Sequence, residues 1–367
     1  MTNPLLAEWT TPFGLPPFGQ FSDEDFAPAF NLALDAARER IAGIASNTAA
    51  PTFENTIAAL ELSDGELDKI AGVFFNLSGA DSNLVREALQ RDLAPKLAAY
   101  SSEITMNRDL FARIDAIWEN RERAGLSAEE LRVLELYRRM FVRAGAKLEG
   151  ADRDRLKDVK ERLAVLGTVF TQNLLADERD WYMDLSDDDL EGLPDFVVAT
   201  ARAAGSERDR PGPVVTLSRS LIVPFLQFSP RRDLREKAFA AWAARGAKGG
   251  ETDNRETAAE TLALREERAK LLGYPDFAQF KLETEMAKTP EAVRDLLMAV
   301  WGPAKRQADA DAEVLSAMMR DDGVNDDLAP WDWRYYAEKR RKAEHDLDEA
   351  ELKPYLQLDR MIEAAFA

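Results

Sequence analysis

The chain has 367 residues, of which 46% are hydrophobic and 31% are charged, and its formal net charge is −19. This is the composition of a globular protein with a large core, and its negative charge would repel phosphate groups, so we expect neither nucleic acid nor an anionic membrane as a partner. Cysteine is absent, which excludes disulfides and thiolate metal sites. No apolar run is long enough to span a bilayer and no signal peptide is recognisable, so we expect a cytoplasmic protein.

An extended arm and a helical lobe are predicted for the first part of the chain. The arm covers residues 1–22, where Pro, Gly and Phe are frequent. The lobe covers residues 23–180, because apolar residues recur there at three- and four-residue steps. Two capping boxes, each a serine followed three residues later by an acid, predict helix starts: Ser22 with Asp25, and Ser127 with Glu130.

The helical period is interrupted in residues 181–228. Two short segments there, 181–185 and 214–217, have the composition of strands and are flanked by Asp, Gly and Pro. We expect them to pair as a small hairpin or sheet. The acidic run 187–189 between them is typical of a helix N-terminus, where negative charge complements the helix dipole.

Long helices are predicted again in residues 229–367, each ending near a Gly or Pro. One segment in this region, Gly246–Thr252, has the glycines and the lysine of a phosphate-binding loop. It lacks the spacing of such a loop and no strand precedes it. We therefore predict that it connects two helices.

The stretch from Pro330 to Ala367 contains several helix signals. Asp332 is expected to N-cap a helix that begins at Trp333. Trp331 and Tyr336 would then face each other as a hydrophobic staple.

A further capping box is predicted at Asp346 with Glu349, and Pro354 suits the first position of a last helix. The predicted apolar face of that helix continues to the end of the chain: Tyr355, Leu358, Met361, Ile362, Ala365 and Phe366. No Gly, Asn or basic last turn follows. We expect the chain to stop within a helix and to leave this face exposed.

Several ordered strings carry a resemblance to a known family. They are LLGYPDFAQFKLETEMAKTPEAV at 271–293, PWDWRYYAE at 330–338 and DLDEAELKPY at 346–355. These strings resemble the zinc metallopeptidases of the thimet oligopeptidase family, family M3, and in particular its bacterial peptidyl-dipeptidase (dipeptidyl carboxypeptidase) branch. The resemblance covers nearly the whole chain but only about the first half of a family member.

The resemblance implies a fold class and an activity. The fold would be mainly α, the multi-helix N-terminal half of a two-lobed, neurolysin-like peptidase whose active site lies in a channel between the lobes. The complete enzyme would bind one zinc ion through an H-E-x-x-H motif in its C-terminal half and release dipeptides from the C-termini of short peptides. The present chain would be inactive alone, and its partner would be the missing C-terminal catalytic half.

The residues themselves exclude the zinc motif from this chain. H-E-x-x-H needs two histidines, and the sequence contains one, His345. His345 and Glu349 could together contact a metal ion, but two ligands are too few for a zinc site. We predict a solvated or capping histidine there, and neither catalytic nor metal-binding residues in the chain.

The aromatic group on the predicted helix has two interpretations: Trp331, Trp333, Tyr335 and Tyr336. It can form a core plug that fixes the start of the helix. Given the resemblance, it can also form a wall of the peptide channel.

Two other function classes remain open. The chain could be a stable, non-catalytic helical module that binds peptides or a partner, in which case it should be monodisperse. It could also be a metal enzyme that uses carboxylates alone, which requires tight binding of a divalent ion.

Overall fold

A computed structural model describes residues 3–81, 83–345 and 355–367. The chain is mainly helical with one two-stranded antiparallel sheet, which confirms the predicted fold class. It divides into two compact units, unit 1 (Met1–Lys157) and unit 2 (Asp158–Ala367). The four-part division predicted from the sequence stays a prediction.

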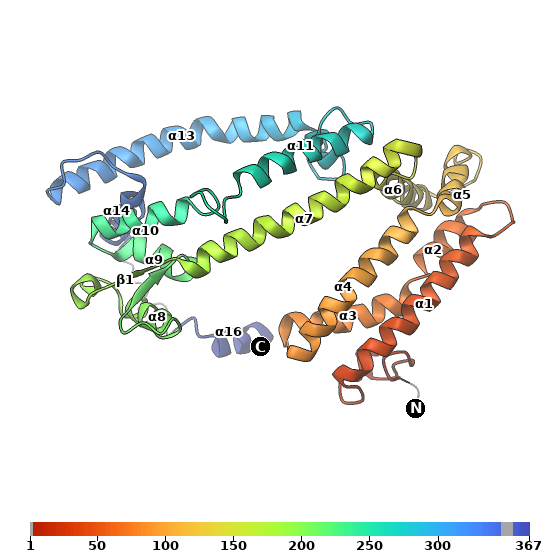
Figure 1. Cartoon of the computed structure of the whole chain (residues 1–367), viewed down its shortest axis with the longest axis horizontal. Coiled ribbons are helices and arrows are strands. Elements are labelled where there is room, and N and C mark those ends of the chain that lie inside the picture. The colour runs from red at the N-terminus through yellow and green to blue at the C-terminus, as the bar shows by residue number, and fades with distance from the viewer. Residues whose placement is uncertain (1–2, 82, 346–354) are drawn as a thin grey trace. The chain divides into compact units, whose positions relative to one another are not determined.

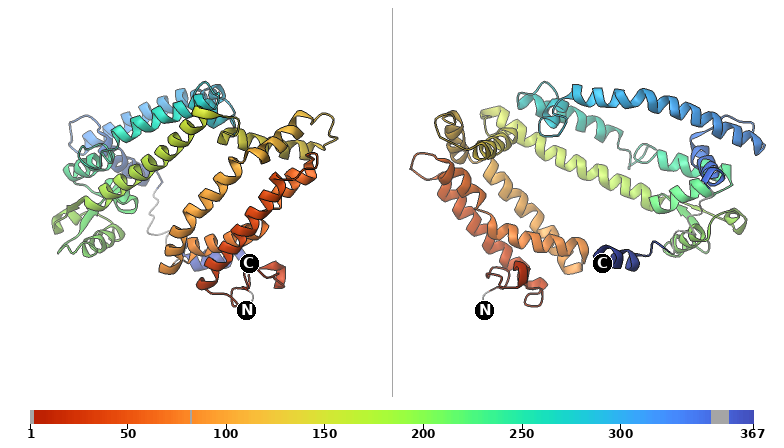
Figure 2. Two further views of the ribbon diagram at one scale, coloured as in Figure 1. Left: turned by 45° about the vertical axis from the view of Figure 1, so that its right-hand side comes forward. Right: turned by 180° about the vertical axis from the view of Figure 1, so that it is seen from behind.

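Unit 1 is built from helices, of which α1, α3 and α4 run side by side (Figures 1 and 2). Its elements are two short turns, η1 (Pro12–Gly14) and η2 (Asp23–Asp25), then α1 (Phe26–Ala45), η3 (Phe53–Ala58), α2 (Ala59–Glu61), α3 (Gly65–Ala80), α4 (Leu84–Thr105), α5 (Arg108–Glu119), α6 (Ala128–Ala144) and the first residues of α7 (Gly150–Asp180).

Both predicted capping boxes of unit 1 are confirmed. The backbone N–H of Ser22 donates to the Asp25 carboxylate at 2.7 Å, in the turn that leads into α1. The backbone N–H of Ser127 donates to Glu130 at 2.7 Å at the start of α6. Each box satisfies N–H groups that have no partner within the first turn of a helix.

The core of unit 1 begins at the N-terminal segment. Leu5 is fully buried in one cluster with residues of α1, α3 and α4. Within this cluster the ring of Phe74 meets Phe26 and Phe30 edge to face, at centroid distances of 5.2 and 5.5 Å. Edge-to-face pairs of this kind add to the burial of apolar area and fix the relative positions of the helices that carry them.

Unit 2 contains the small sheet and the longest helices of the described residues (Figure 1). Its elements are most of α7, β1 (Tyr182–Asp184), η4 (Asp187–Leu190), α8 (Asp195–Ser206), β2 (Val214–Thr216), α9 (Arg219–Phe228), α10 (Arg232–Ala243), α11 (Arg255–Leu271), α12 (Phe277–Leu282), α13 (Pro290–Asp321), α14 (Pro330–His345) and α16 (Leu358–Phe366).

The predicted strand segments do pair. Strands β1 and β2 are antiparallel, with Met183 opposite Val215. Val214 and Val215 are buried in a cluster formed with α8, α9 and α10. The sheet therefore joins the core of unit 2 through β2, and the acidic run beside it forms the short turn η4.

The end of unit 2 differs in part from expectation. The capping box at Asp346 and Glu349 and the start at Pro354 lie outside the described residues. Helix α16 begins at Leu358, and its apolar side chains are exposed. In the described part of the chain, no helix combines the length and the apolar character needed to cross a membrane.

Candidate functional site

Helix α14 begins at Pro330, whose fixed φ suits a first helical turn. Asp332 lies within that turn, so the predicted N-cap at Asp332 was wrong. Its carboxylate accepts a hydrogen bond from the backbone N–H of Ala329 at 3.1 Å, as an acid at the third helical position does in a capping box. Trp331 also lies inside the helix, with its ring 6.3 Å from that of Phe239, so it does not precede the helix as a staple requires.

Asp332 is completely buried and is held by two arginines of α10. Arg232 Nη2 donates to Asp332 Oδ2 at 3.0 Å, and Arg235 Nη2 donates to Asp332 Oδ1 at 2.9 Å. Arg235, also buried, donates to the carbonyl oxygens of Ser229 at 2.7 Å and Trp331 at 3.1 Å. These hydrogen bonds fasten α14 to α10.

The charge state of Asp332 follows from these contacts. Burial opposes ionisation, but the hydrogen bonds from Arg232 and Arg235 outweigh it and hold the pKa of Asp332 below its ordinary value. The carboxylate is therefore ionised and neutralised within the protein. A pair satisfied in this way supports the structure and leaves no charge for a ligand.

The four predicted aromatic residues do not share one environment. Tyr336 is buried in a cluster with Leu315 and Met319 of α13. The Tyr335 ring stands edge-on to Tyr336 with centroids 5.1 Å apart, and the guanidinium of Arg235 lies 4.2 Å from its centre. Tyr335, Tyr336 and Trp331 thus fix α14 against its neighbours, in line with the core interpretation.

Trp333 is the most exposed of the four, with 36% of its surface accessible. It lines a cavity of about 200 Å³ together with side chains of α13 and the last turns of α14. Arg340 neutralises the carboxylates there, donating to Asp311 at 2.8 Å and to Glu344 at 2.7 Å. The cavity is smaller than the pockets that usually hold a ligand, so Trp333 is a candidate for a wall and not for a complete site.

His345 is the last residue of α14 and is exposed, while Glu349 lies outside the described residues. Among the residues that the structure describes, no three His, Cys, Asp or Glu side chains gather where they could hold a metal ion. A chain with one histidine and no cysteine cannot supply two imidazole or thiolate ligands to a zinc ion. The zinc motif with its two histidines therefore cannot lie in this chain.

The loop Gly246–Thr252 connects α10 to α11, as predicted, and is anchored by Asp177 of α7. The buried Asp177 carboxylate accepts hydrogen bonds from the N–H of Gly246 at 2.8 Å and the hydroxyl of Thr252 at 2.6 Å, and pairs with Lys248 at 2.6 Å. Although burial opposes ionisation, these donors hold the pKa of Asp177 below its ordinary value. The donors of this loop are therefore occupied by a carboxylate of the chain itself.

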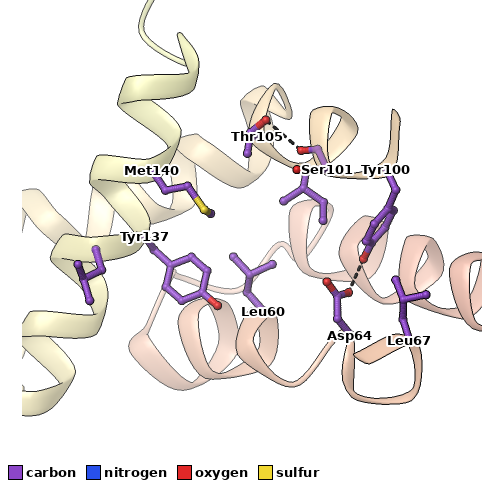
Figure 3. A pocket seen from close by; sticks show the side chains of 10 residues that line it. Leu60, Asp64, Leu67, Tyr100, Ser101, Thr105, Tyr137 and Met140 are labelled. Carbon is purple, nitrogen blue, oxygen red and sulfur yellow. Dashed lines mark hydrogen bonds between the residues drawn. The ribbon is translucent and has the colours of Figure 1, made fainter. Parts of the chain in front are cut away.

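A larger cavity, of about 410 Å³, lies within unit 1 (Figure 3). It is lined by Leu60, Asp64, Leu67, Tyr100, Ser101, Ile104, Thr105, Leu136, Tyr137 and Met140. Residues from four elements, α2, α3, α4 and α6, and the connection between α2 and α3 meet here. Sequence reasoning missed this cavity because no local pattern links segments so far apart in the chain.

Comparison with known proteins identifies relatives for the whole chain. Residues 225–366 match the family described as Peptidase family M3. The chain is 34% identical to dipeptidyl carboxypeptidase of Escherichia coli K12, over 98% of this chain and 53% of that protein. It is 34% identical to dipeptidyl carboxypeptidase of Salmonella typhimurium, over 99% of this chain and 54% of that protein. It is 29% identical to oligopeptidase A of Escherichia coli K12, over 100% of this chain and 54% of that protein.

The chain therefore spans about half the length of the curated relatives it matches. The family match includes the end of α9 and all of α10, α11, α12, α13, α14 and α16, so it contains Asp332, Trp333 and the two arginines of α10. The alignments extend beyond it to nearly every residue of the chain. The chain is thus similar to peptidase family M3 over residues 225–366 and to these peptidases over nearly its whole length.

Proposed function

We propose that this chain is the N-terminal portion of a zinc-dependent peptidase that releases dipeptides from the C-termini of short peptides in the cytoplasm. The observation that carries the proposal is the alignment of 98% of the chain with a protein named dipeptidyl carboxypeptidase. Oligopeptidase A aligns over the same length at 29% identity, against 34%. The preference for dipeptide release over other peptide cleavage rests on that difference.

In the complete enzyme, zinc would be held by residues outside these 367, because the zinc motif needs two histidines. The contribution of this chain would be to shape the path of the peptide. Trp333 is the candidate for the channel wall, since an exposed indole offers an apolar face and an N–H donor to a peptide. Trp331, Tyr335 and Tyr336 would act behind it by holding α14 in place.

Exposed apolar faces of unit 2 support the idea that further protein covers it. On α16, Leu358, Ile362 and Phe366 are 73%, 47% and 89% exposed. On α13, four exposed residues recur at three- and four-residue steps on one side of the helix: Leu296, Leu297, Val300 and Trp301. Apolar patches of this kind usually mark an interface. We propose that the C-terminal half of the enzyme covers them.

The alternative is a non-catalytic helical module that binds peptides or a partner. It requires that the chain alone be monodisperse, whereas the exposed face of α16 favours association. Sedimentation of the purified chain with a hydrophobic dye separates the two. A metal enzyme that uses carboxylates alone would bind a divalent ion tightly, and calorimetry with Mg²⁺, Mn²⁺ and Zn²⁺ tests this.

The direct test is to supply a C-terminal half. The chain is co-expressed with the remaining half of the Escherichia coli dipeptidyl carboxypeptidase, and the purified complex is loaded with zinc. We expect dipeptide release from a peptide with a free C-terminus, none from the amidated peptide, and none from either half alone. A folded, zinc-loaded complex that cleaves neither peptide would contradict the proposal.

The same complex tests the channel wall. If Trp333 contacts the peptide, Trp333→Ala should raise KM more than it lowers kcat, because it removes binding made by substrate and transition state alike. Leu262→Ala on α11, where the side chain is 64% exposed, is the control for loss of an exposed apolar side chain in the same unit. Equal KM and kcat values for the Trp333→Ala complex and the unmodified complex would show that Trp333 does not line the channel.

A further inference from the structure

The cavity of unit 1 has an apolar lining that is open to solvent. Leu60 and Met140 are among the apolar side chains that line it (Figure 3), together with Ile104 and Leu136, and Leu136 and Met140 of α6 are 41% and 43% exposed. Its volume of about 410 Å³ falls within the range of pockets that hold small ligands or peptide side chains. Exposed Leu and Met beside a recess provide the surface that an apolar side chain can cover.

Two tyrosines in the lining hold carboxylates by their hydroxyl groups. Tyr100 donates to Asp64, and Tyr137 donates to Glu61. Burial raises the pKa of both tyrosines well above the ordinary value, and the neighbouring carboxylates raise it further. Both hydroxyl groups therefore remain protonated and donate to Asp64 and Glu61.

In the part of the chain that the structure describes, these carboxylates form no ion pair. Across the described residues of the chain, no ion pair joins Glu61, Asp64 or the neighbouring Asp68 to a lysine or arginine. Burial raises the pKa of Asp68, and the charges of Asp64 and Glu61 raise it further. Three acids that repel one another and form no ion pair of their own leave an excess of negative charge in this part of unit 1.

Two arginines of α1 in the same unit are already engaged. Arg38 Nε lies 2.9 Å from Glu103, and Arg40 Nη2 lies 2.8 Å from Glu66. Arg40 also donates to the carbonyl oxygen of Ser63 at 2.9 Å. Both guanidinium groups thus hold other acceptors, and among the described residues neither forms an ion pair with Asp64 or Glu61.

We propose that this cavity is a docking site for a basic, apolar peptide segment. A leucine- or phenylalanine-like side chain would enter between Leu60 and Met140, and an adjacent lysine or arginine would meet the carboxylates of Asp64 and Glu61. The negative charge of the site favours a basic peptide. An acidic peptide would add to the repulsion among the carboxylates, and an uncharged peptide would not relieve that repulsion. The site does not depend on the peptidase activity proposed above, because all the residues that form it belong to unit 1 of this chain.

The test uses the whole chain and peptides blocked at both ends. Acetyl-Leu-Phe-Arg-Arg-amide is titrated by calorimetry and compared with acetyl-Leu-Phe-Glu-Glu-amide and acetyl-Ser-Ser-Arg-Arg-amide. The blocked C-terminus makes the result independent of dipeptide release. We expect saturable 1:1 binding of the first peptide, weakened by salt, and at least about tenfold weaker binding of the other two.

Variants locate the site. Asp64→Asn with Glu61→Gln keeps the size of both side chains and should weaken binding by about tenfold. Leu136→Ser should also weaken peptide binding, because it removes an apolar side chain from the lining of the cavity. Glu39→Gln, an exposed acid of α1 outside the cavity, is the matched control and should bind as the unmodified chain does, with circular dichroism confirming the fold of each variant.

Three results would overturn the proposal. One is equal affinity for all three peptides, and another is unchanged affinity in the Asp64→Asn, Glu61→Gln variant. The third is dimerisation of the chain that Leu136→Ser abolishes, which would show that a second copy fills the cavity.

Discussion

Asp332 in unit 2 and Asp64 in unit 1 are carboxylates with opposite environments. Asp332 is fully buried and receives hydrogen bonds from Arg232 and Arg235. Asp64 is half-buried and accepts hydrogen bonds from the hydroxyl groups of Tyr100 and Ser63, with no ion pair among the described residues. The first charge is neutralised by the protein and supports the fold, whereas the second is oriented but not neutralised. Only the second arrangement leaves charge available to a ligand.

The largest predicted effect comes from breaking the neutralised pair. Asp332→Ala leaves Arg235 buried, 1% exposed, without its carboxylate. We expect the free energy of unfolding of unit 2 to fall by about 3–5 kcal/mol, the usual cost of an unpaired buried charge. Urea titration followed by circular dichroism measures it. Asp326→Ala is the control: its side chain is 68% exposed and also pairs with Arg232, so we expect a loss below about 1 kcal/mol.

An intermediate effect is expected at Asp177, which is buried and is held by two neutral hydrogen-bond donors and one lysine. Asp177→Ala leaves the N–H of Gly246 and the hydroxyl of Thr252 without their acceptor. We expect a loss of about 2–3 kcal/mol in urea titrations, with faster amide exchange at Gly246. Lys248→Gln, which removes a half-exposed charge, should cost less than about 1 kcal/mol. Equal losses in the two variants would show that the ion pair dominates.

The contributions of Asp332 and Asp68 to the free energy of unfolding should change with pH in opposite directions. The pKa of Asp332 is lowered in the folded chain, so its stabilising contribution is complete above the ordinary value of 3.8 and is lost as pH falls through the lowered pKa. The pKa of Asp68 is raised, so its contribution is complete below 3.8 and is lost as pH rises through the raised pKa. Urea titrations from about pH 3 to pH 7 on Asp332→Asn and Asp68→Asn should deviate from the parent chain in opposite directions.

The smallest predicted effect is a gain. Asp64 and Asp68 are four residues apart at the start of α3, and like charges at this spacing repel by about 0.2–0.5 kcal/mol. Asp68→Asn should stabilise unit 1 by about that amount at neutral pH, as measured by its unfolding midpoint. The gain should be smaller when Asp64 is already Asn, because burial and Glu61 still oppose the charge of Asp68. A loss of stability in Asp68→Asn would mean that the charge is compensated after all.

Features set by neighbouring residues were predictable. The boxes at Ser22 and Ser127 need only a residue three positions away, and the strands 182–184 and 214–216 follow from their composition. The start of α14 was misplaced because Asp332 suits an N-cap by itself. Pro330, which prefers the first helical position, supplied the competing signal.

The sites were less predictable because their contacts are distant in sequence. Asp332 meets Arg232 and Arg235, whose positions in the chain are 100 and 97 residues away, and the unit 1 cavity needs Leu60, Tyr100 and Tyr137 together. Nothing in the local sequence distinguishes these arginines from solvated ones. The resemblance to the peptidase family supplied the function class, but not these contacts.

The separation of Arg235 from Asp332 also bears on how the chain is made. A ribosome that adds about 5–20 residues per second needs about 5–20 s to reach Asp332 after Arg235. During that interval α10 carries two cationic side chains whose counterion has not been synthesised. Contacts between such distant residues also form slowly, because a long loop must close first. The core around α10 should therefore complete its assembly late, and nascent chains that stop before α14 should be the forms that chaperones and proteases engage.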